Sequence, residues 1–241
     1  MVINNIEYPN VLIKFGKLEH LRELKEGIVY FNQAEYFRKQ ENNKGFDTRE
    51  GKIRINPSEL SRISDPTIDL IKHLNIEEVN ISSMKSGKTP IFCCSEIDSS
   101  NIKSLGNNKY CLSDTFINEM KQWGSTLLVM SKDEFCSKVE KSSIKLEVKP
   151  YMSKMKYDQD ISKTDEKDLK LILRTDRYDT FFHKTSEYAA QNEFRIILGD
   201  ENLIPKSSNH FYLAIGKLET AKIFDLNELT DLIFNTIEKT D

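Results

Sequence analysis

The chain has 241 residues, with 35 basic and 38 acidic side chains and a formal net charge of −3. Hydrophobic residues make up 38% of the chain, which is enough to form a core and excludes wholesale disorder. The nearly neutral balance excludes a histone-like polycation but allows a local basic groove. This length favours one large domain, so we expect a single domain over residues 1–241.

The cysteines and the apolar runs predict a reduced, cytoplasmic protein that does not cross a membrane. Cys93, Cys94, Cys111 and Cys136 show no Cys-x-x-Cys spacing, so neither a disulfide framework nor a zinc site is favoured, and we expect no bound metal. No apolar run approaches the roughly 20 residues that a membrane helix needs. The first ten residues also lack the basic-then-apolar pattern of a secretory signal.

Apolar periodicity predicts short strands and helices in the first half of the chain. Leu18, Leu21 and Leu24 lie three residues apart, as on the apolar face of a helix, and Gly27 follows where a helix would end. The apolar run PIFCCSE is typical of a buried strand. The expected elements are strands at Asn10–Phe15, Ile28–Phe31 and Pro90–Glu96, helical segments at Lys17–Lys25, Glu35–Arg38 and Ser58–Leu74, and a loop at Asn42–Gly51.

The second half of the chain continues this mixture. Ser113 and Ser131 each precede a helical pattern and are expected to cap it. The polar segment Met152–Lys170 is interpreted as an insertion within the domain. The expected elements are helices at Ser113–Trp123, Ser131–Glu140 and Leu226–Glu238, and strands at Thr126–Met130, Ile144–Tyr151, Glu193–Leu198, His210–Ile215 and Ala221–Phe224. Because no regular βαβ alternation emerges, an α+β fold is favoured over a doubly wound sheet.

Common catalytic and nucleotide-binding motifs are incomplete or missing. The run Ser86-Gly-Lys-Thr matches the end of a phosphate-binding loop, but Ser82 stands where that loop requires glycine. A solvated turn is the simpler interpretation. The sequence contains no GxSxG, HExxH or GxGxxG motif, and its four histidines are scattered.

The densest group of chemically active residues is the stretch FFHKTSEYAAQNEFRIIL, residues 181–198. Gln191 and Glu193 are separated by one residue and come directly before an apolar strand. A carboxylate at the first residue of a strand is well placed at the mouth of a cleft, where it can bind a sugar hydroxyl or stabilise a developing cation. A structural alternative is that Glu193 pairs with Arg195 on the same face of the strand.

The Gln-x-Glu pattern at the start of a strand resembles the glutamate motif of the ADP-ribosyltransferase superfamily. The N-terminal run LIKFGKLEHLRELKEGIVYF is similar to the opening of DarT-type toxins, which modify DNA. This resemblance implies a mixed, mostly antiparallel split β-sheet with flanking helices, and NAD as the substrate. It implies that Glu193 contacts the nicotinamide-side ribose and that Gln191 orients the acceptor. Lys14 stands where the family usually has His or Arg and lacks the planar fork of Arg, and a register shifted by one residue would place Phe15 there instead.

A second resemblance spans most of the chain. Short motifs at Lys14-Phe15, Gly27–Phe31, Pro90–Glu96 and Tyr188–Ile197 occur in the same order in poorly characterised bacterial proteins, some of which are associated with phage defence. This similarity implies a shared fold more firmly than it implies an activity.

Other residues are candidates to bind NAD under this resemblance. A tyrosine stacks on nicotinamide in the related poly-ADP-ribose polymerases, which makes Tyr30 or Tyr36 a candidate, and Arg38 and Arg49 can hold phosphates. A structural alternative places Tyr30 in the core and Arg49 in a salt-bridged loop. The residues expected to bind NAD are Lys14, Tyr30, Tyr36, Arg38, Arg49, Ser95, Lys184 and Tyr188.

The implied activity is transfer of ADP-ribose from NAD to a macromolecule by a toxin or anti-phage effector. Its transition state would resemble that of glycoside cleavage, and we expect Glu193→Gln to lower activity about a hundredfold without unfolding the protein. RNA or DNA is the favoured acceptor, because aromatic residues alternate with a loose basic cluster. A toxin would also have a neutralising protein partner. The basic residues are Lys14, Lys17, Arg38, Lys39, Lys44, Arg49, Lys52 and Arg54, and the aromatic residues are Tyr36, Phe37 and Phe46.

Two other functions stay open at this point. The first is a metal-dependent nuclease-like effector, with a site formed by Asp47, Glu50 and Glu193 together with Lys184. The second is a non-catalytic binding or sensor module on the same fold, which the lysine at position 14 favours.

Overall fold

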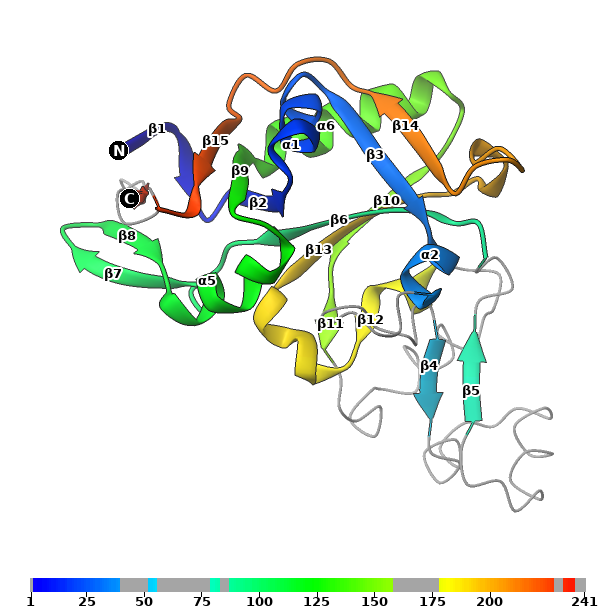
Figure 1. Ribbon diagram of the computed structural model, residues 1–241, viewed down its shortest axis with the longest axis horizontal. Helices are drawn as coiled ribbons and strands as arrows, with labels where there is room; N and C mark the ends of the chain where they lie inside the picture. The colour runs from blue at the N-terminus through cyan, green and yellow to red at the C-terminus, as the bar shows by residue number, and fades with distance from the viewer. Residues whose placement is uncertain are drawn as a thin grey trace, which may run out of the picture.

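The computed structural model describes residues 2–39, 52–55, 79–82, 87–157, 178–227 and 232–236. It is a mixed α+β structure with mostly antiparallel sheets and a few helices (Figure 1). The α-helices are α1 (Leu18–Lys25), α2 (Ala34–Lys39), α5 (Asp114–Met120) and α6 (Lys132–Lys145). The 3₁₀ helices are η1 (Lys121–Trp123), η3 (Asp179–Phe182), η4 (Ser186–Gln191) and η5 (Glu201–Leu203).

Within the described residues, the larger sheet has eight strands in the order β10-β13-β6-β2-β9-β15, with β3 also pairing with β6 and β14. A smaller four-stranded sheet has the order β1-β16-β8-β7. The strands of the larger sheet are β2 (Val11–Gly16), β3 (Ile28–Gln33), β6 (Pro90–Glu96), β9 (Thr126–Ser131), β10 (Pro150–Lys154), β13 (Glu193–Leu198), β14 (His210–Ala214) and β15 (Lys222–Asp225). The other strands are β1 (Val2–Tyr8), β4 (Lys52–Ile55), β5 (Val79–Ser82), β7 (Ile102–Gly106), β8 (Lys109–Leu112), β11 (Lys156–Tyr157), β12 (His183–Lys184) and β16 (Ile233–Thr236).

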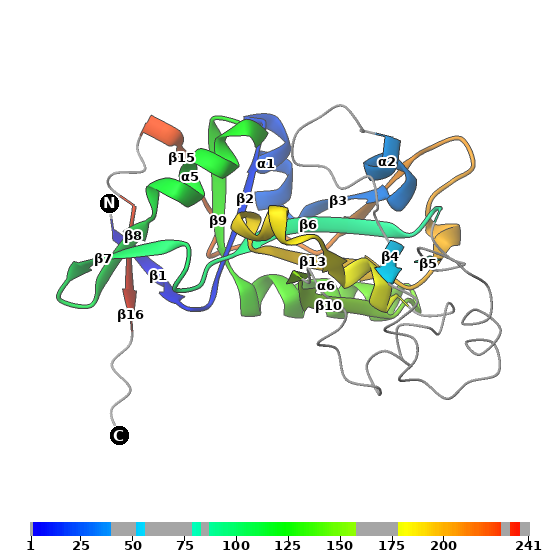
Figure 2. The ribbon, with the colours of Figure 1, turned by 90° about the horizontal axis from the view of Figure 1, so that it is seen from below.

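The larger sheet is buried on both faces by different helices. Alternate residues of β2 and β9 belong to two separate apolar clusters, as the two-residue period of a strand requires. One cluster contains Phe135 and Val139 of α6, and the other contains Phe116 and Met120 of α5. In Figure 2, α6 and α5 accordingly lie on opposite sides of the sheet. This double coverage explains why the central strands are continuous apolar runs.

The central strands β2 and β6 are paired over a short stretch and then diverge. These strands pair only at Leu12 with Glu96 and Ile13 with Ser95, after which β2 continues along β9. At its other end β6 pairs with β3, at Ile91 and Pro90. The edge of β6 between these two contacts therefore faces a gap in the sheet, while its opposite edge pairs with β13 from Glu193 to Ile197.

Most of the predicted elements are confirmed. β6 and β13 have the expected bounds, Gly27 follows α1 with a φ of +88°, and Ser113 and Ser131 cap α5 and α6. The sequence analysis did not predict β1, β7 or β8. The loop at Asn42–Gly51 and the helix at Ser58–Leu74 lie in stretches outside the described residues.

Two predicted elements are wrong. The strand expected at Ile144–Tyr151 is instead the end of α6, a turn and the start of β10, because Ile144 and Leu146 alternate but are 65% and 46% exposed. The helix expected at Leu226–Glu238 contains β16, which pairs with β1 and β8 and buries Phe234. In both segments the apolar residues fit a helix and a strand almost equally well, so burial in the tertiary structure decides which of the two forms.

The polar segment Met152–Lys170 is also only partly an insertion. Its first residues complete β10, which pairs with β13, and Lys156–Tyr157 forms β11 beside β12. The rest of the segment lies outside the described residues. Because Tyr157 contacts the start of β13, the beginning of this segment is part of the candidate site described below.

Candidate active site

A cavity opens on the α5 side of the larger sheet, beside the gap between β2 and β6. Its volume is about 110 Å³, several times the roughly 10–15 Å³ that one water needs, so it admits a small molecule or one ring of a larger ligand. Its polar lining includes Lys14, Ser95, Lys184, Gln191 and Glu193, five residues that the sequence analysis selected. They come from β2, β6, β12, η4 and β13.

Glu193 is the centre of a buried ion-pair network. Its Oε1 accepts a hydrogen bond from Arg195 Nε at 2.6 Å, and its Oε2 accepts one from Lys184 Nζ at 3.0 Å. The three side chains are only 8%, 2% and 5% exposed. Glu193 and Arg195 share one face of β13, so the structural pairing that the sequence allowed is present, and the carboxylate lines the cavity as well.

The ion pairs determine the charge state of Glu193. Burial alone raises the pKa of this carboxyl group, but the charges of Arg195 and Lys184 outweigh it and bring the pKa well below its ordinary value. Glu193 is therefore ionised at neutral pH. Burial and the charge of Glu193 raise the pKa of the Cys93 thiol on the adjacent strand, which keeps that thiol protonated and unreactive.

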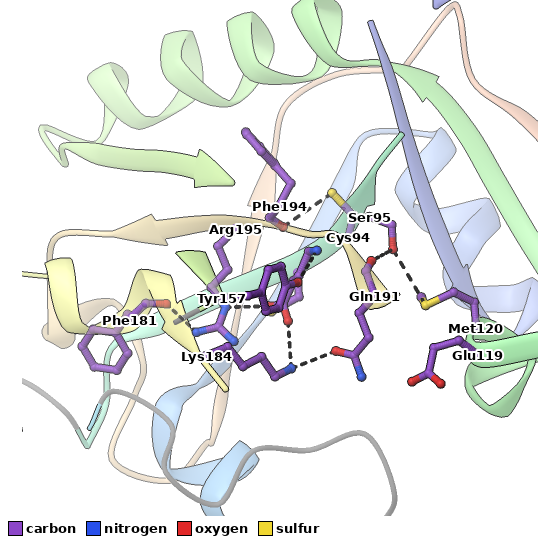
Figure 3. Close-up of polar contacts among 12 residues, drawn as sticks. Cys94, Ser95, Glu119, Met120, Tyr157, Phe181, Lys184, Gln191, Phe194 and Arg195 are labelled. Atoms are coloured by element: carbon purple, nitrogen blue, oxygen red, sulfur yellow. Dashed lines mark hydrogen bonds and ion pairs between the residues drawn. The ribbon is translucent and has the colours of Figure 1, made fainter. Parts of the chain in front are cut away.

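Gln191 and Ser95 form a second polar group in the cavity wall. Ser95 Oγ donates to the Gln191 carbonyl oxygen at 2.8 Å, while Lys184 Nζ donates to the side-chain oxygen of Gln191 at 2.8 Å (Figure 3). Lys184 thus contacts both residues of the Gln-x-Glu pattern. Ser95 reaches the backbone of this segment and so orients the pattern from β6.

Asn192, the middle residue of the Gln-x-Glu pattern, makes the turn that connects η4 to β13. Asn192 has a φ of +44°, in the left-handed region that asparagine tolerates better than most residues. Its side-chain nitrogen donates to the carbonyl oxygen of Glu96 at 2.5 Å and to the side-chain oxygen of Asn101. Its own carbonyl oxygen accepts from the Glu96 N–H at 2.9 Å, so the turn is fastened to the end of β6.

Tyr157 fixes the backbone of Glu193. The Glu193 N–H donates to the Tyr157 hydroxyl oxygen at 2.6 Å. Burial and the nearby charge of Glu193 raise the pKa of Tyr157, so its hydroxyl stays neutral. Arg195 is fastened in a similar way, because its Nη1 donates to the carbonyl oxygen of Phe181 at 2.5 Å (Figure 3). The carboxylate is therefore held through both its side chain and its backbone.

Lys14 bridges the gap between the diverging strands. Its Nζ donates to the Cys93 carbonyl oxygen at 2.7 Å, at a point where β6 pairs with β13 on one edge and β2 has already separated from it on the other. The ammonium lies 5.2 Å from the centroid of the Phe92 ring. Among the described residues Lys14 has no carboxylate within ion-pairing distance, so its positive charge is not neutralised by a partner in this part of the protein.

The rest of the cavity wall is apolar and partly aromatic. Phe15 and Ile13 come from β2, Met120 and Trp123 from the α5–η1 segment, and Phe37 from α2. Met120 and Trp123 follow each other across one helical turn, which places two large side chains on the same wall. Such a lining can accept a flat ring next to the ionised Glu193.

The remaining NAD-binding candidates are outside this lining. Tyr30 is 39% exposed on β3 and stacks on His210 at 5.0 Å, so it belongs to an exposed ring cluster with Tyr212 and is neither core nor cavity wall. Tyr36 contacts the ring of Phe37 at 5.8 Å from outside the lining, and Arg38 pairs with Glu35 at 3.5 Å.

Tyr188 and Arg49 are the last two residues that the sequence analysis predicted to bind NAD. The Tyr188 ring lies 4.6 Å from Lys184 Nζ, so it supports the ion-pair network and is not part of the cavity lining. Arg49 lies outside the described residues. The sequence analysis mentioned Arg195 only as a structural partner and missed Asn192, Tyr157 and Cys93. The available signal for Arg195 was a second charged residue, two positions after Glu193, in an otherwise apolar strand.

The arrangement around Glu193 suits a cation-paired carboxylate better than a metal ligand. Both of its oxygens already accept from positively charged groups. The described residues contain no group of three or more His, Cys, Asp or Glu side chains that could hold a metal ion. Asp47 and Glu50, the other carboxylates considered for a metal site, lie outside the described residues.

Comparison with known proteins gives no family assignment. No protein-family model, no curated protein and no solved structure matches this chain. Among the helices in the described part of the chain, none is long and apolar enough to span a membrane.

Proposed function

We propose that this protein transfers ADP-ribose from NAD to a macromolecule, with a split-sheet fold of the ADP-ribosyltransferase type. One observation carries the proposal: Lys14, Ser95, Gln191 and Glu193, chosen by resemblance to that superfamily, line one cavity at the point where β2 and β6 separate. The four residues span almost 180 positions of sequence and meet only in the fold. Their convergence supports a shared chemical role.

In the proposed reaction Glu193 acts on the ribose next to nicotinamide. A carboxylate can accept about four hydrogen bonds, and three are used by Arg195, Lys184 and the Cys93 thiol, so Glu193 can still accept one from the ribose 2′-hydroxyl. The C1′–N bond breaks with its electron pair leaving on nicotinamide, and the ribose passes through an oxocarbenium-like state. The nucleophile of the acceptor then bonds to C1′ and loses its proton to water.

The other residues have supporting roles in this proposal. The aromatic wall at Phe37 and Trp123 receives the nicotinamide ring, and Lys14 donates to a ribose hydroxyl or a phosphate. Gln191 orients the acceptor. RNA or DNA is the favoured acceptor, and a toxin or anti-phage effector with a neutralising protein partner is the favoured biological role.

The test is to incubate the purified protein with labelled NAD and with total cellular RNA, DNA and protein in separate reactions. Glu193→Gln is the inactive comparison, and Glu96→Gln is the matched control, because Glu96 is paired with Lys132 and lies outside the cavity lining. Circular dichroism verifies that each variant is folded at the assay temperature. We expect transfer and nicotinamide release with the wild type and Glu96→Gln, and at least a hundredfold less with folded Glu193→Gln.

Two outcomes would refute the proposal. One is the absence of nicotinamide release and label transfer with every fraction, which would favour a non-catalytic binding module. The other is equal activity of folded Glu193→Gln and wild type. Transfer to the protein fraction alone would retain the enzyme class and reject the nucleic-acid acceptor.

A further inference from the structure

Tyr30, His210 and Tyr212 form an exposed ring cluster on β3 and β14. Tyr30 lies opposite Tyr212 in the pairing of these strands, and His210 lies two residues before Tyr212, on the same face. The Tyr30 and His210 rings are stacked with their centroids 5.0 Å apart, whereas the Tyr212 ring is inclined at 64° and 79° to these two rings. Neither of them therefore lies flat against Tyr212, which is 50% exposed.

The opposite face of β3 and β14 supplies the burial that these strands need. It carries Val29, Phe31 and Leu213, which are buried in the apolar cluster that includes residues of α6. A sheet that is buried on one face usually carries small polar or charged side chains on the other. Adjacent large rings in water are instead typical of a surface that binds a partner.

The ring cluster lies on the same face of the larger sheet as the candidate cavity. Residues directly opposite each other on paired strands point to the same side of a sheet. His210 is opposite Asn32, and Asn32 is opposite Ile91 of β6. Cys93 and Ser95 follow Ile91 at two-residue intervals along β6, and both line the cavity. A ligand on the ring cluster can therefore extend into the cavity without crossing the sheet.

Two rings of α2 connect the ring cluster with the cavity. This helix begins directly after β3 (Figure 1). Burial and the electrostatic influence of Tyr212 and Tyr36 raise the pKa of Tyr30, so Tyr36 lies close to the ring cluster. The Tyr36 ring meets the Phe37 ring edge-on at 5.8 Å, and Phe37 lines the cavity. Aromatic side chains thus follow one another from Tyr212 to the cavity wall.

Exposed lysines border this path at its α2 end. Lys88 adjoins the start of α2, because the residues on either side of it accept from the first two N–H groups of that helix. Lys206 lies in the loop before β14, and this loop accepts from the last N–H of β3. Neither lysine has a carboxylate within ion-pairing distance among the described residues. The nearby carboxylates already have partners within the protein; they are Glu35, Asp200 and Glu201.

We propose that the ring cluster binds bases of a single-stranded nucleic acid by stacking, and that the strand continues past Tyr36 and Phe37 to the cavity. Stacking requires bases with an uncovered flat face, which a single strand offers and a duplex does not. The unpaired lysines attract the phosphates of such a strand. The path into the cavity rests on the proposed function, since it makes this strand the acceptor, but binding at the ring cluster does not require NAD.

The binding test measures fluorescence anisotropy of a labelled, mixed-sequence oligonucleotide of about 12 nucleotides, as DNA and as RNA, without NAD. Tyr212→Leu removes the most exposed ring, and Tyr212→Phe is the matched control that keeps it; circular dichroism verifies that both are folded. We expect Tyr212→Leu to bind about tenfold more weakly, equivalent to about 1.4 kcal/mol for one lost stacking contact, and Tyr212→Phe to stay within about twofold of wild type. The same oligonucleotide annealed into a duplex should bind at least about tenfold more weakly than the single strand.

A second measurement locates the strand on the wild-type protein and so does not depend on the folding of any variant. Oligonucleotides that contain 5-iodouracil are bound to the protein and irradiated, and the crosslinked peptides are identified by mass spectrometry. We expect crosslinks in β3 and β14, at Tyr30, His210 or Tyr212. Crosslinks found only outside β3, α2 and β14 would contradict the proposal.

These measurements separate failure of the ring-cluster proposal from failure of the proposed function. Equal binding by Tyr212→Leu and wild type, equal loss in Tyr212→Phe and Tyr212→Leu, or equal affinity for duplex and single strand overturns base stacking, while nicotinamide release still supports the enzyme. Absence of any oligonucleotide binding overturns it in the same way and leaves a protein partner for this surface. Ring-dependent binding without nicotinamide release rejects the enzyme and the path into the cavity, and retains the ring cluster as a nucleic-acid-binding surface.

Discussion

Replacement of Glu193 by Gln tests the charge network, and the structure sets the size of the expected effect. The cluster of Glu193, Lys184 and Arg195 has a net charge of +1, which becomes +2 in the variant. All three side chains are less than 10% exposed, so water compensates little. Breaking a buried pair typically costs about 3–5 kcal/mol. Because Gln keeps one oxygen for one of the two cations, we expect a loss near the lower end, about 3 kcal/mol.

Thermal unfolding followed by circular dichroism measures this loss. For a chain of this size 1 kcal/mol corresponds to about 2–4 °C in Tm, so Glu193→Gln should lower Tm by about 6–12 °C. The control Glu96→Gln removes the charge from a partly exposed pair with Lys132, whose two side chains are 18% and 31% exposed, and should cost about 1 kcal/mol. The double variant Glu193→Gln/Lys184→Met restores the net charge of +1 and should recover part of the lost stability.

The reasoning is refuted if Glu193→Gln lowers Tm no more than Glu96→Gln, or if the double variant is no more stable than Glu193→Gln. The ion pairs also change the expectation that Glu193→Gln leaves the fold unaffected. A carboxylate shared by two buried cations contributes to stability as well as to the proposed chemistry. Activity of this variant therefore has to be compared below its own unfolding transition.

Three further predictions follow from particular contacts. Burial raises the pKa of Glu134, but hydrogen bonds from Thr220 and Glu219 outweigh burial and lower it to about 2. The ionised Glu134 therefore stabilises the folded protein fully above about pH 4.5, and this contribution is lost as the pH falls towards 2. Glu134→Gln should flatten the decline in Tm that the wild type shows over that interval. A Cβ on Gly27 would lie 2.1 Å from Gly216 O, whereas Gly106 has a similar positive φ in open space, so Gly27→Ala should lower Tm clearly more than Gly106→Ala; equal effects would exclude the clash. Asn192→Ala should be about 1 kcal/mol less stable in urea unfolding than Asn192→Gly, because both lose the amide but only Ala is strained at a φ of +44°; equal midpoints would contradict this.

The strands that carry the candidate site could be predicted because their sequences are unambiguous. PIFCCSE and EFRIIL are apolar runs of strand length, and the structure gives them the expected bounds. Polar residues inside such runs, like Ser95, Glu193 and Arg195, have to be satisfied in the protein interior. That requirement explains why the sequence indicates that these residues have partners inside the protein without showing which residues those partners are.

The partners could not be predicted because they depend on long-range pairing. Tyr157 belongs to a segment that reads as a polar insertion, yet the pairing of β11 with β12 brings its hydroxyl to the Glu193 backbone. Tyr30 has the composition of a stacking residue, but the register of β3 with β14 places it opposite Tyr212, on an exposed face. The left-handed turn at Asn192 likewise depends on Asn101 and Glu96, more than 90 positions earlier in the chain.

The cavity contains two kinds of cation, which differ in whether they are paired with a carboxylate. Lys184 and Arg195 share the single Glu193 carboxylate and donate their hydrogen bonds within the protein, although this cluster keeps a net charge of +1. Lys14 donates to an uncharged carbonyl group and has no carboxylate partner among the described residues, so its field extends into the cavity. An anionic group such as a phosphate would therefore gain most from Lys14. Since exposed charges are screened more than buried pairs, added salt should weaken binding through Lys14 while the Glu193 network stays intact.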